Sequence, residues 1–191
     1  MKVSETSLPG VLLLEPRVFG DERGFFMETW NAERYREAGI PVDFVQANHA
    51  RSRRGVLRGL HYQIGRPQAK LIFAVSGEIL DVAVDVRRGS KTFGRWLGVS
   101  LSGDNHRQLF VPAGFAHGYC VVGEHADVSY LCSDLYWPQG DRGIRWDDPA
   151  IGIAWPAGEK LLSAKDCALP LLADATDLPV CDPPPREAPA G

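Results

Sequence analysis

Residues 55–63, GVLRGLHYQ, place a cation and a titratable base inside a stretch that has the pattern of a β-strand. In a regular strand, Arg58 and His61 point to opposite faces, because side chains alternate at every residue. A bulge at Gly59 would bring both to one side, and glycine within a strand often marks a bulge or a close backbone approach. The alternative is a half-buried edge strand with two solvated polar residues. The pattern thus leaves two interpretations open, a reactive site and an ordinary edge strand.

Acid–base chemistry fits the other titratable residues better than metal chemistry does. Small jelly rolls that bind a metal often use a His-x-His pair, whereas this chain has His61-Tyr62-Gln63. The other histidines are scattered along the chain, so we expect no metal site and no cofactor. Isolated polar residues in strands are mostly structural, and only convergence on one cavity would make them functional. Ten titratable residues fall within strand patterns: Glu28, His49, Arg58, His61, Lys70, Asp81, Asp85, His117, Asp127 and Tyr130.

The composition favours one domain and argues against two classes of partner. The chain has 191 residues, of which 45% are hydrophobic, enough for one domain with a sizeable core. Its 21 Lys and Arg residues against 24 Asp and Glu residues give a net charge of −3, which provides no attraction to nucleic acid or to an anionic membrane. The first residues lack the long apolar run of a leader, so we expect a cytoplasmic protein. The four cysteines form no C-x-x-C pair and are expected to be free thiols.

The elements that must position these residues are predicted to be nearly all β-strands. Residues 21–30 suit an arm that lies over another surface, and Asn31 can cap a short helix over 32–38, closed by Gly39. Many short strands at near-regular spacing favour a β-sandwich or barrel, and we prefer an all-β jelly roll because it leaves a cavity between its sheets. Strands are expected at 44–49, 55–62, 69–75, 78–86, 96–101, 108–111, 117–122 and 128–133, with Ser76-Gly77 among the turns between them.

We expect a single domain over residues 1–170, with an N-terminal arm and short helix at 1–41. Residues 171–191 form a C-terminal extension that is rich in proline and is expected to be flexible at its end.

The ordered motifs of the chain resemble those of one enzyme family. Over about residues 3–170 the sequence is similar to the dTDP-4-dehydrorhamnose 3,5-epimerase family, and so many motifs in family order make chance similarity implausible. The motifs are DERGFF (21–26), QANH (46–49), VLRGLHYQ (56–63), QAK (68–70), GE (77–78) leading to DVAVD (81–85), TFG (92–94), VPAGFAHG (111–118), WDDP (146–149) and LSAKD (162–166).

The resemblance implies a cupin-type jelly roll without a metal, and a homodimer whose N-terminal arms exchange. Its substrate would be a dTDP-linked 4-keto-6-deoxy sugar, inverted at C3 and C5 on the way to dTDP-L-rhamnose. The chemistry is consistent with this, since the C4 ketone acidifies the hydrogens on both neighbouring carbons. One base can remove each hydrogen in turn, and inversion then needs an acid on the opposite face of the ring.

The resemblance also implies three catalytic residues. His61 would be the base, and Asp166 the carboxylate that orients its imidazole. Tyr130 would be the acid, since a tyrosine is neutral near pH 7 yet can protonate a strongly basic enolate.

The implied ligand-binding residues come from most of the chain. Arg58 and Lys70 would hold charge near the sugar and the diphosphate, and Tyr136 would stack on the thymine. Asp141 stands where many relatives have Glu, which shortens its reach toward the ligand. The other positions implied to contact the ligand are Arg23, Phe26, Glu28, Gln46, Asn48, His117 and Lys165.

Several alternatives remain open at this stage. His117 could be a core histidine, Tyr136 a packing aromatic and Lys165 a solvated charge. A relative that inverts only C3, in another deoxysugar pathway, cannot be separated from a 3,5-epimerase by single residues. A non-catalytic nucleotide-sugar binding module would not need both a base and an acid, and a metal-dependent cupin oxygenase would need the missing His-x-His ligands.

Overall fold

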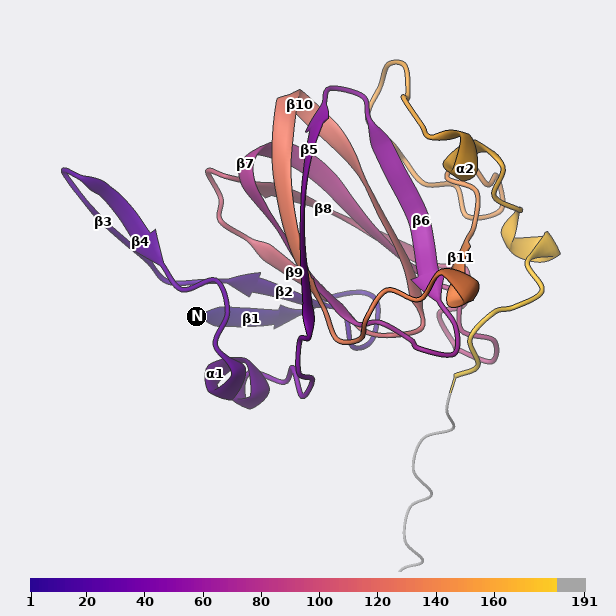
Figure 1. The fold of residues 1–191 in the computed structure, drawn as a ribbon, viewed down its shortest axis with the longest axis horizontal. Helices are drawn as coiled ribbons and strands as arrows, with labels where there is room; N and C mark the ends of the chain where they lie inside the picture. The colour runs from indigo at the N-terminus through magenta and orange to yellow at the C-terminus, as the bar shows by residue number, and fades with distance from the viewer. Residues whose placement is uncertain (182–191) are drawn as a thin grey trace, which may run out of the picture.

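The computed structural model describes residues 1–181, and the proline-rich end of the extension lies outside the described residues. Within them most of the regular secondary structure is strand, as predicted (Figure 1). No helix among these residues is long and apolar enough to cross a membrane. The strands are β1 (Lys2–Glu5), β2 (Leu12–Glu15), β3 (Val18–Asp21), β4 (Gly24–Met27), β5 (Gln46–Arg53), β6 (Leu57–Gln63), β7 (Lys70–Asp85), β8 (Trp96–Ser102), β9 (Gln108–Val111), β10 (Phe115–Cys132) and β11 (Asp141–Gly143). The helices are α1 (Ala32–Glu37), η1 (Pro138–Gly140), α2 (Ala164–Cys167) and η2 (Leu172–Asp174).

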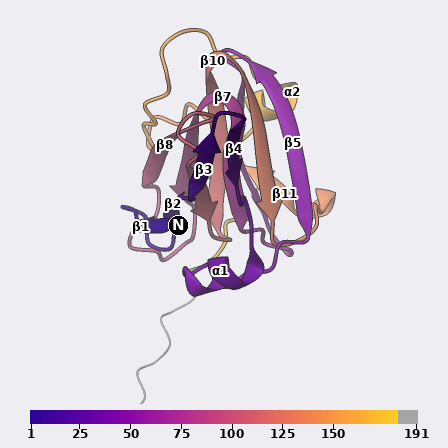
Figure 2. The ribbon, with the colours of Figure 1, turned by 90° about the vertical axis from the view of Figure 1, so that its left-hand side faces the viewer.

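The two longest strands, β7 and β10, run antiparallel and belong to both layers of a jelly roll. The first half of β7 pairs with β9, which leads on to β2 and β1, and the second half of β10 pairs with β5. The second half of β7 pairs with β8. The first half of β10 pairs with β6, which pairs in turn with β11. Each long strand therefore bends from one sheet into the other, and the sheets enclose an interior (Figures 1 and 2).

The predicted turn at Ser76-Gly77 is wrong, because β7 passes through it without ending. Gly77 has φ of +70°, and the pairing with β10 slips in register between Val121 and Ala126. A Cβ on Gly77 would lie 1.9 Å from the His125 carbonyl oxygen, so only glycine fits this close approach. The strands predicted at 69–75 and 78–86 are thus one bent strand, as are those predicted at 117–122 and 128–133.

Side chains alternate along β7 between the interior and the outer faces. Ile72 and Ala83 pack in the cluster between the sheets. Leu71 faces outward, into a second cluster that α1 covers with the buried Tyr35. Val82 faces outward on the other layer, where it packs in a cluster with Leu172 and other residues of the C-terminal segment. The helix α1 begins at the predicted cap, where the Asn31 side chain accepts a hydrogen bond from the Arg34 amide.

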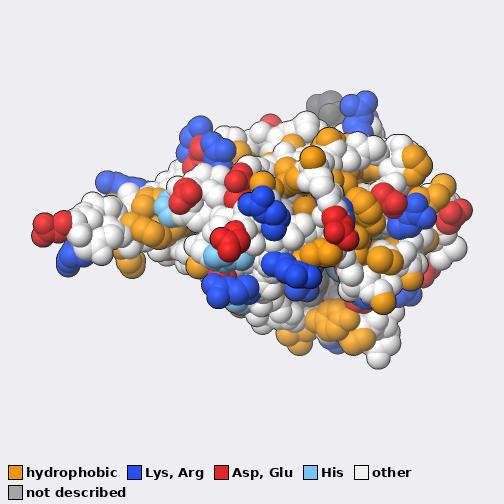
Figure 3. All heavy atoms as spheres, turned by 90° about the horizontal axis from the view of Figure 1, so that it is seen from above, with side chains coloured by type: hydrophobic (Ala, Val, Ile, Leu, Met, Phe, Trp, Pro, Cys, Tyr) orange, Lys and Arg blue, Asp and Glu red, His pale blue; other side chains and the backbone are white. Residues whose placement is uncertain are grey.

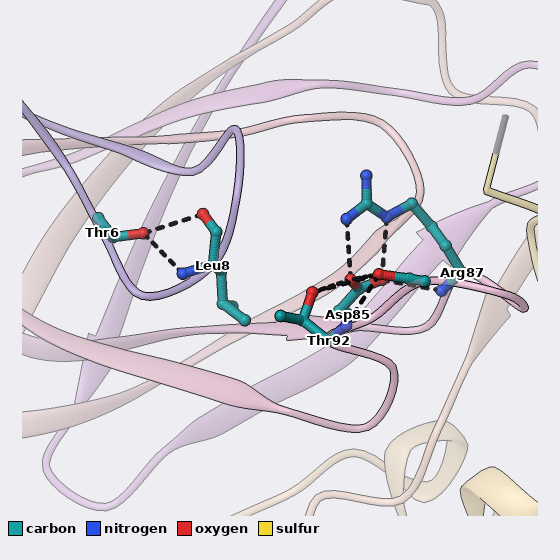
Figure 4. Close-up of polar contacts among 6 residues, drawn as sticks. Thr6, Leu8, Asp85, Arg87 and Thr92 are labelled. Carbon is teal, nitrogen blue, oxygen red and sulfur yellow. Dashed lines mark hydrogen bonds and ion pairs between the residues drawn. The ribbon is translucent and has the colours of Figure 1, made fainter. Parts of the chain in front are cut away.

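A buried carboxylate anchors the turn that follows β7. Asp85 accepts hydrogen bonds from the Arg87 guanidinium at 2.9 and 2.8 Å and from the Thr92 hydroxyl at 2.6 Å (Figure 4). Burial raises the pKa of Asp85, but these bonds outweigh it and hold the pKa at about 2. The carboxylate therefore stays ionised at neutral pH and ties the turn to the end of the strand.

The projecting arm is shorter than residues 1–41. Residues 2–5 and 12–15 belong to the main sheet, because β1 pairs with β2 and β2 pairs with β9. Among the described residues, only the β3–β4 hairpin, whose strands pair with each other alone, extends from the body as a narrow projection (Figures 1 and 3). It exposes three large apolar rings, Phe19, Phe25 and Phe26.

Candidate active site

A cavity of about 480 Å³ opens between the two sheets. An adjoining cavity of about 350 Å³ shares four of its lining residues: His61, Lys70, Tyr130 and Lys165. We refer to them as the larger and the smaller cavity. Of the 14 residues predicted to form a site, seven line the larger cavity: Arg58, His61, Lys70, His117, Tyr130, Lys165 and Asp166.

A bulge in β6 places Arg58 and His61 in the same cavity. His61 lies opposite His117 on β10, and Arg58 lies opposite Tyr119, so β6 has one residue more than β10 between these pairs. Gly59 makes this possible with φ of +136°, where a Cβ would lie 2.6 Å from the Gly118 Cα. Of the two alternatives that the sequence left open, the structure has the bulge at Gly59, and Arg58 and His61 both line the larger cavity.

His61 and Asp166 form a hydrogen-bonded pair at the cavity wall. The distance from His61 Nε2 to Asp166 Oδ1 is 2.6 Å, and Asp166 is only 3% exposed. Ser163 caps the short helix α2 by accepting a hydrogen bond from the Asp166 amide, which fixes the start of the helix that carries Asp166.

The charge of Asp166 determines the proton position on His61. Burial raises the pKa of Asp166, but the hydrogen bond from His61 outweighs it and leaves the pKa below its usual value. The carboxylate is therefore ionised and accepts the Nε2 proton. Nδ1 is left with a lone pair that can accept a proton, and the carboxylate stabilises the imidazolium that results.

Tyr130 and Lys70 come from the opposite sheet, where β10 and β7 pair. Burial raises the pKa of the Tyr130 hydroxyl, so it is a neutral donor at pH 7. Burial lowers the pKa of the Lys70 amine, and no carboxylate among the described residues lies within 4.0 Å of it. Both side chains border both cavities. The site thus has a base on one sheet, with a phenol and an unpaired amine on the other.

A second histidine–carboxylate pair lies beside the first. His117 Nε2 is 2.8 Å from Asp81 Oδ1, and both residues are buried. His117 is therefore both a partnered core histidine and part of the wall of the larger cavity.

Four more predicted residues line the smaller cavity and contact one another. The Gln46 side-chain oxygen accepts a hydrogen bond from the Tyr136 amide at 2.8 Å, and its NH₂ donates to Asn48 at 3.1 Å. Asp141 accepts hydrogen bonds from the Tyr136 hydroxyl, at 2.8 Å, and from Lys165. Although burial raises the pKa of Asp141, these two donors lower it below its usual value. This network joins the β11 strand to the start of α2.

The three predicted residues of the arm line neither cavity. Arg23 pairs with Asp21 at the tip of the hairpin. Glu28 accepts hydrogen bonds from Asn31 and Arg34 at the start of α1. Phe26 is 71% exposed. Within one chain, the structure does not bring these residues to the other eleven.

Tyr119, which lines the larger cavity, is not among the site residues predicted from the sequence. It follows His117 by two residues in the same strand, and residues two apart share a face. That spacing was the available signal, and a tyrosine within an apolar run did not stand out from the core.

The chain matches the model of one protein family over residues 5–174, and this family is dTDP-4-dehydrorhamnose 3,5-epimerase. The enzyme of that name from Pseudomonas aeruginosa is 53% identical, over 94% of this chain and 100% of its own length. A dTDP-4-dehydrorhamnose 3-epimerase from Streptomyces niveus is 38% identical, over 93% of this chain and 86% of its own.

A solved structure has the same fold. The crystal structure of dTDP-6-deoxy-D-glucose-3,5-epimerase from Legionella pneumophila, in complex with dTDP-4-keto-L-rhamnose, superposes with a TM-score of 0.93 and 47% identity. The alignment covers 95% of this chain and 99% of that chain.

Proposed function

The chain belongs to the dTDP-4-dehydrorhamnose 3,5-epimerase family, and on that premise we propose that it inverts C3 and C5 of a dTDP-linked 4-keto-6-deoxyhexose. This is the epimerase step of dTDP-L-rhamnose biosynthesis, and the enzyme is an isomerase. The observation that carries the proposal is the His61–Asp166 pair in the wall of a cavity that Tyr130 also lines. A base and an acid on opposing sheets suit a reaction that takes a proton from one face of a ring and returns it to the other.

In the first step, His61 removes the proton from a carbon next to the C4 ketone. The electron pair of the broken C–H bond moves into the ring and forms an enolate. Asp166 supports this step because its negative charge stabilises the imidazolium as it forms. The same base serves C3 and C5, since both carbons adjoin the ketone.

Lys70 is proposed to stabilise the enolate oxygen. Its amine has no carboxylate partner within 4.0 Å in the described residues, so it is available to an oxygen of the ligand. A hydrogen-bond donor aimed at developing negative charge in a cavity with little water is an effective source of rate enhancement. His117, which also lines this cavity, is the second candidate donor.

In the second step, Tyr130 returns a proton from the opposite face. Burial raises its pKa, so the hydroxyl carries its proton until the enolate, a much stronger base, removes it. Donation at the opposite face inverts the carbon, and donation back from His61 restores the starting sugar. The steps transfer only protons, and a cofactor has no part in them.

We place the nucleotide in the smaller cavity. Tyr136 borders it and is 54% exposed, which leaves its ring free to stack on thymine. Gln46, Asn48, Asp141 and Lys165 provide hydrogen-bonding groups around it. Arg58 is proposed to meet the negative charge of the ligand in the larger cavity.

We propose that the protein is a homodimer with exchanged arms. Within the described residues, β5 pairs only with β10, so its other edge is open to a further strand. The β3–β4 hairpin projects from the body with exposed phenylalanines, and Arg23, Phe26 and Glu28 reach neither cavity of their own chain. An arm laid over a partner's β5 would bring these residues to the nucleotide. Removal of residues 18–27 is expected to give a monomer by analytical ultracentrifugation, and an unchanged dimer would contradict the proposal.

A cytoplasmic location is the remaining part of the proposal. Cys120 and Cys132 are buried free thiols, which suits a reducing compartment.

Deuterium exchange tests the proposed function. The protein is incubated with dTDP-4-keto-6-deoxyglucose in deuterated water, and NMR follows label at each ring carbon. Label at C3 and C5 supports 3,5-epimerisation. Label at C3 alone supports the alternative of a C3-only epimerase, the activity for which the Streptomyces niveus relative is named. Binding of the substrate without label at either carbon would support the alternative of a non-catalytic nucleotide-sugar binding module.

A further inference from the structure

Tyr119 lies in the middle of a row of polar side chains that crosses the sheet at the larger cavity. Its direct neighbour on β7 is Asp81, and its direct neighbour on β6 is Arg58. Directly paired residues in antiparallel strands point to the same face, so the three side chains lie side by side. Tyr119 and Arg58 line the larger cavity, together with His61.

The Tyr119 hydroxyl is buried, and no group among the described residues lies in good hydrogen-bonding geometry to it, although the Ser52 and Arg58 side chains lie close enough to lower its pKa. The residue is 3% exposed, and its oxygen is one of two buried side-chain atoms in this state, the other being Asp81 Oδ2. Buried polar groups in folded proteins are nearly always paired, because an unpaired one loses its bonds to water without compensation. A hydroxyl that lacks a well-formed hydrogen bond contributes less to stability than a paired hydroxyl does.

Tyr35 provides a contrast within the same chain. It is also buried, but its hydroxyl lies 2.8 Å from the Gln108 side-chain oxygen and 3.1 Å from the Thr29 carbonyl oxygen. Tyr35 packs in the cluster under α1 and lines neither cavity. The Tyr35 hydroxyl therefore has a structural role, because its hydrogen bonds hold it in the fold. The hydrogen bonds of the described residues give the Tyr119 hydroxyl no such role.

The neighbours of Tyr119 can make room for a ligand. Arg58 is exposed, and its guanidinium donates one hydrogen bond of regular geometry, from Nε to the Ser52 hydroxyl at 3.2 Å, while also interacting with Tyr119. Movement of this guanidinium toward a ligand oxygen would leave the adjacent tyrosine hydroxyl open to the cavity. Burial raises the pKa of Tyr119, so the hydroxyl is neutral and able to donate.

We propose that Tyr119 is a further ligand-binding residue, whose hydroxyl donates a hydrogen bond to a hydroxyl oxygen of the hexose ring in the larger cavity, alongside Arg58. The inference rests on the proposed function, since it assumes that a nucleotide-linked hexose occupies this cavity. It assigns to Tyr119 a contact with the sugar and none with the nucleotide, because Tyr119 lines only the larger of the two cavities.

The test is Tyr119→Phe, which removes only the hydroxyl and keeps the ring in the core. Calorimetry measures the Kd for dTDP and for dTDP-6-deoxyglucose, an analogue without the ketone and therefore without turnover. We expect the Kd for dTDP-6-deoxyglucose to rise about tenfold, which corresponds to the loss of one hydrogen bond. The Kd for dTDP is expected to stay unchanged. The Tm of the unliganded variant is expected to equal or exceed that of the wild type, because an unpaired polar group has been removed.

The matched control is Tyr35→Phe, which removes a paired hydroxyl from a residue that lines neither cavity. We expect it to lower the Tm and to leave both Kd values unchanged. The inference is overturned if Tyr119→Phe binds dTDP-6-deoxyglucose as tightly as the wild type does, or if it weakens both ligands equally. If the wild type binds neither ligand, the proposed function fails, and this inference fails with it.

Discussion

The Asp166→Asn variant tests the role of the carboxylate behind His61. The 2.6 Å hydrogen bond joins His61 to an ionised acceptor that is 3% exposed. A hydrogen bond to a charged group in such a site is worth about 1.5–3 kcal/mol. Each 1.36 kcal/mol corresponds to a tenfold change in rate, so loss of the charge is expected to lower kcat about 10- to 150-fold. The substitution is nearly isosteric, and KM is expected to change little.

Stability at low pH gives a second readout for the same variant. The folded-state pKa of Asp166 lies below its unfolded value, so its contribution to stability is present above the unfolded pKa and is lost as the pH falls through the folded pKa. Asparagine does not titrate. We therefore expect the Tm difference between wild type and Asp166→Asn to be constant near pH 7 and to shrink below about pH 4.

Asp148→Asn is the matched control for a buried carboxylate without a histidine. Asp148 is also buried, and it accepts hydrogen bonds from the amides of Ala150 and Leu172, at 2.8 and 2.7 Å, outside both cavities. We expect a lower Tm with normal kcat. Turnover of folded Asp166→Asn at the wild-type rate, or an equal loss of kcat in Asp148→Asn, would show that the Asp166 charge has no specific role in catalysis.

Two further substitutions address the acid and the bulge. Tyr130→Phe is expected to slow inversion by at least about 100-fold while slowing deuterium exchange much less, because His61 remains to remove and return protons; equal losses in both NMR signals would contradict this order of steps. Gly59→Ala is expected to lower the free energy of unfolding by at least about 2 kcal/mol, measured by urea denaturation, because the backbone has φ of +136° and the new Cβ would lie 2.6 Å from the Gly118 Cα. A wild-type urea midpoint for Gly59→Ala would argue against the tight packing of β6 on β10 at this point.

The strand pattern of the chain was predictable because local signals and tertiary structure agree over most of it. Asn31 and Gly39 bound the α1 segment as predicted. The turn predicted at Ser76-Gly77 is wrong because the same residue types occur in tight turns and in bulges. Only the pairing with β10 decides between the two structures. No local signal could show that β7 and β10 bend from one sheet into the other.

The site was predictable only in part from the residues themselves. The bulge at Gly59 could be anticipated from an Arg, a Gly and a His in one strand. The pairing of His61 with Asp166 spans 105 residues, and no spacing rule connects them; the family resemblance supplied it. Tyr119 escaped notice because an unpaired hydroxyl is visible only once its surroundings are known. The arm residues Arg23, Phe26 and Glu28 line neither cavity of their own chain, and their proposed place beside a second chain cannot be derived from one sequence.

The central claim is that one base, His61, removes the proton at both C3 and C5. The most direct measurement compares His61→Ala with the wild type in deuterated water, with dTDP-4-keto-6-deoxyglucose as substrate and NMR detection at each carbon. Binding of dTDP verifies that the variant is folded. Exchange at C3 and C5 is expected to be lost together. Exchange at the wild-type rate at either carbon would show that another group removes that proton and would contradict the claim.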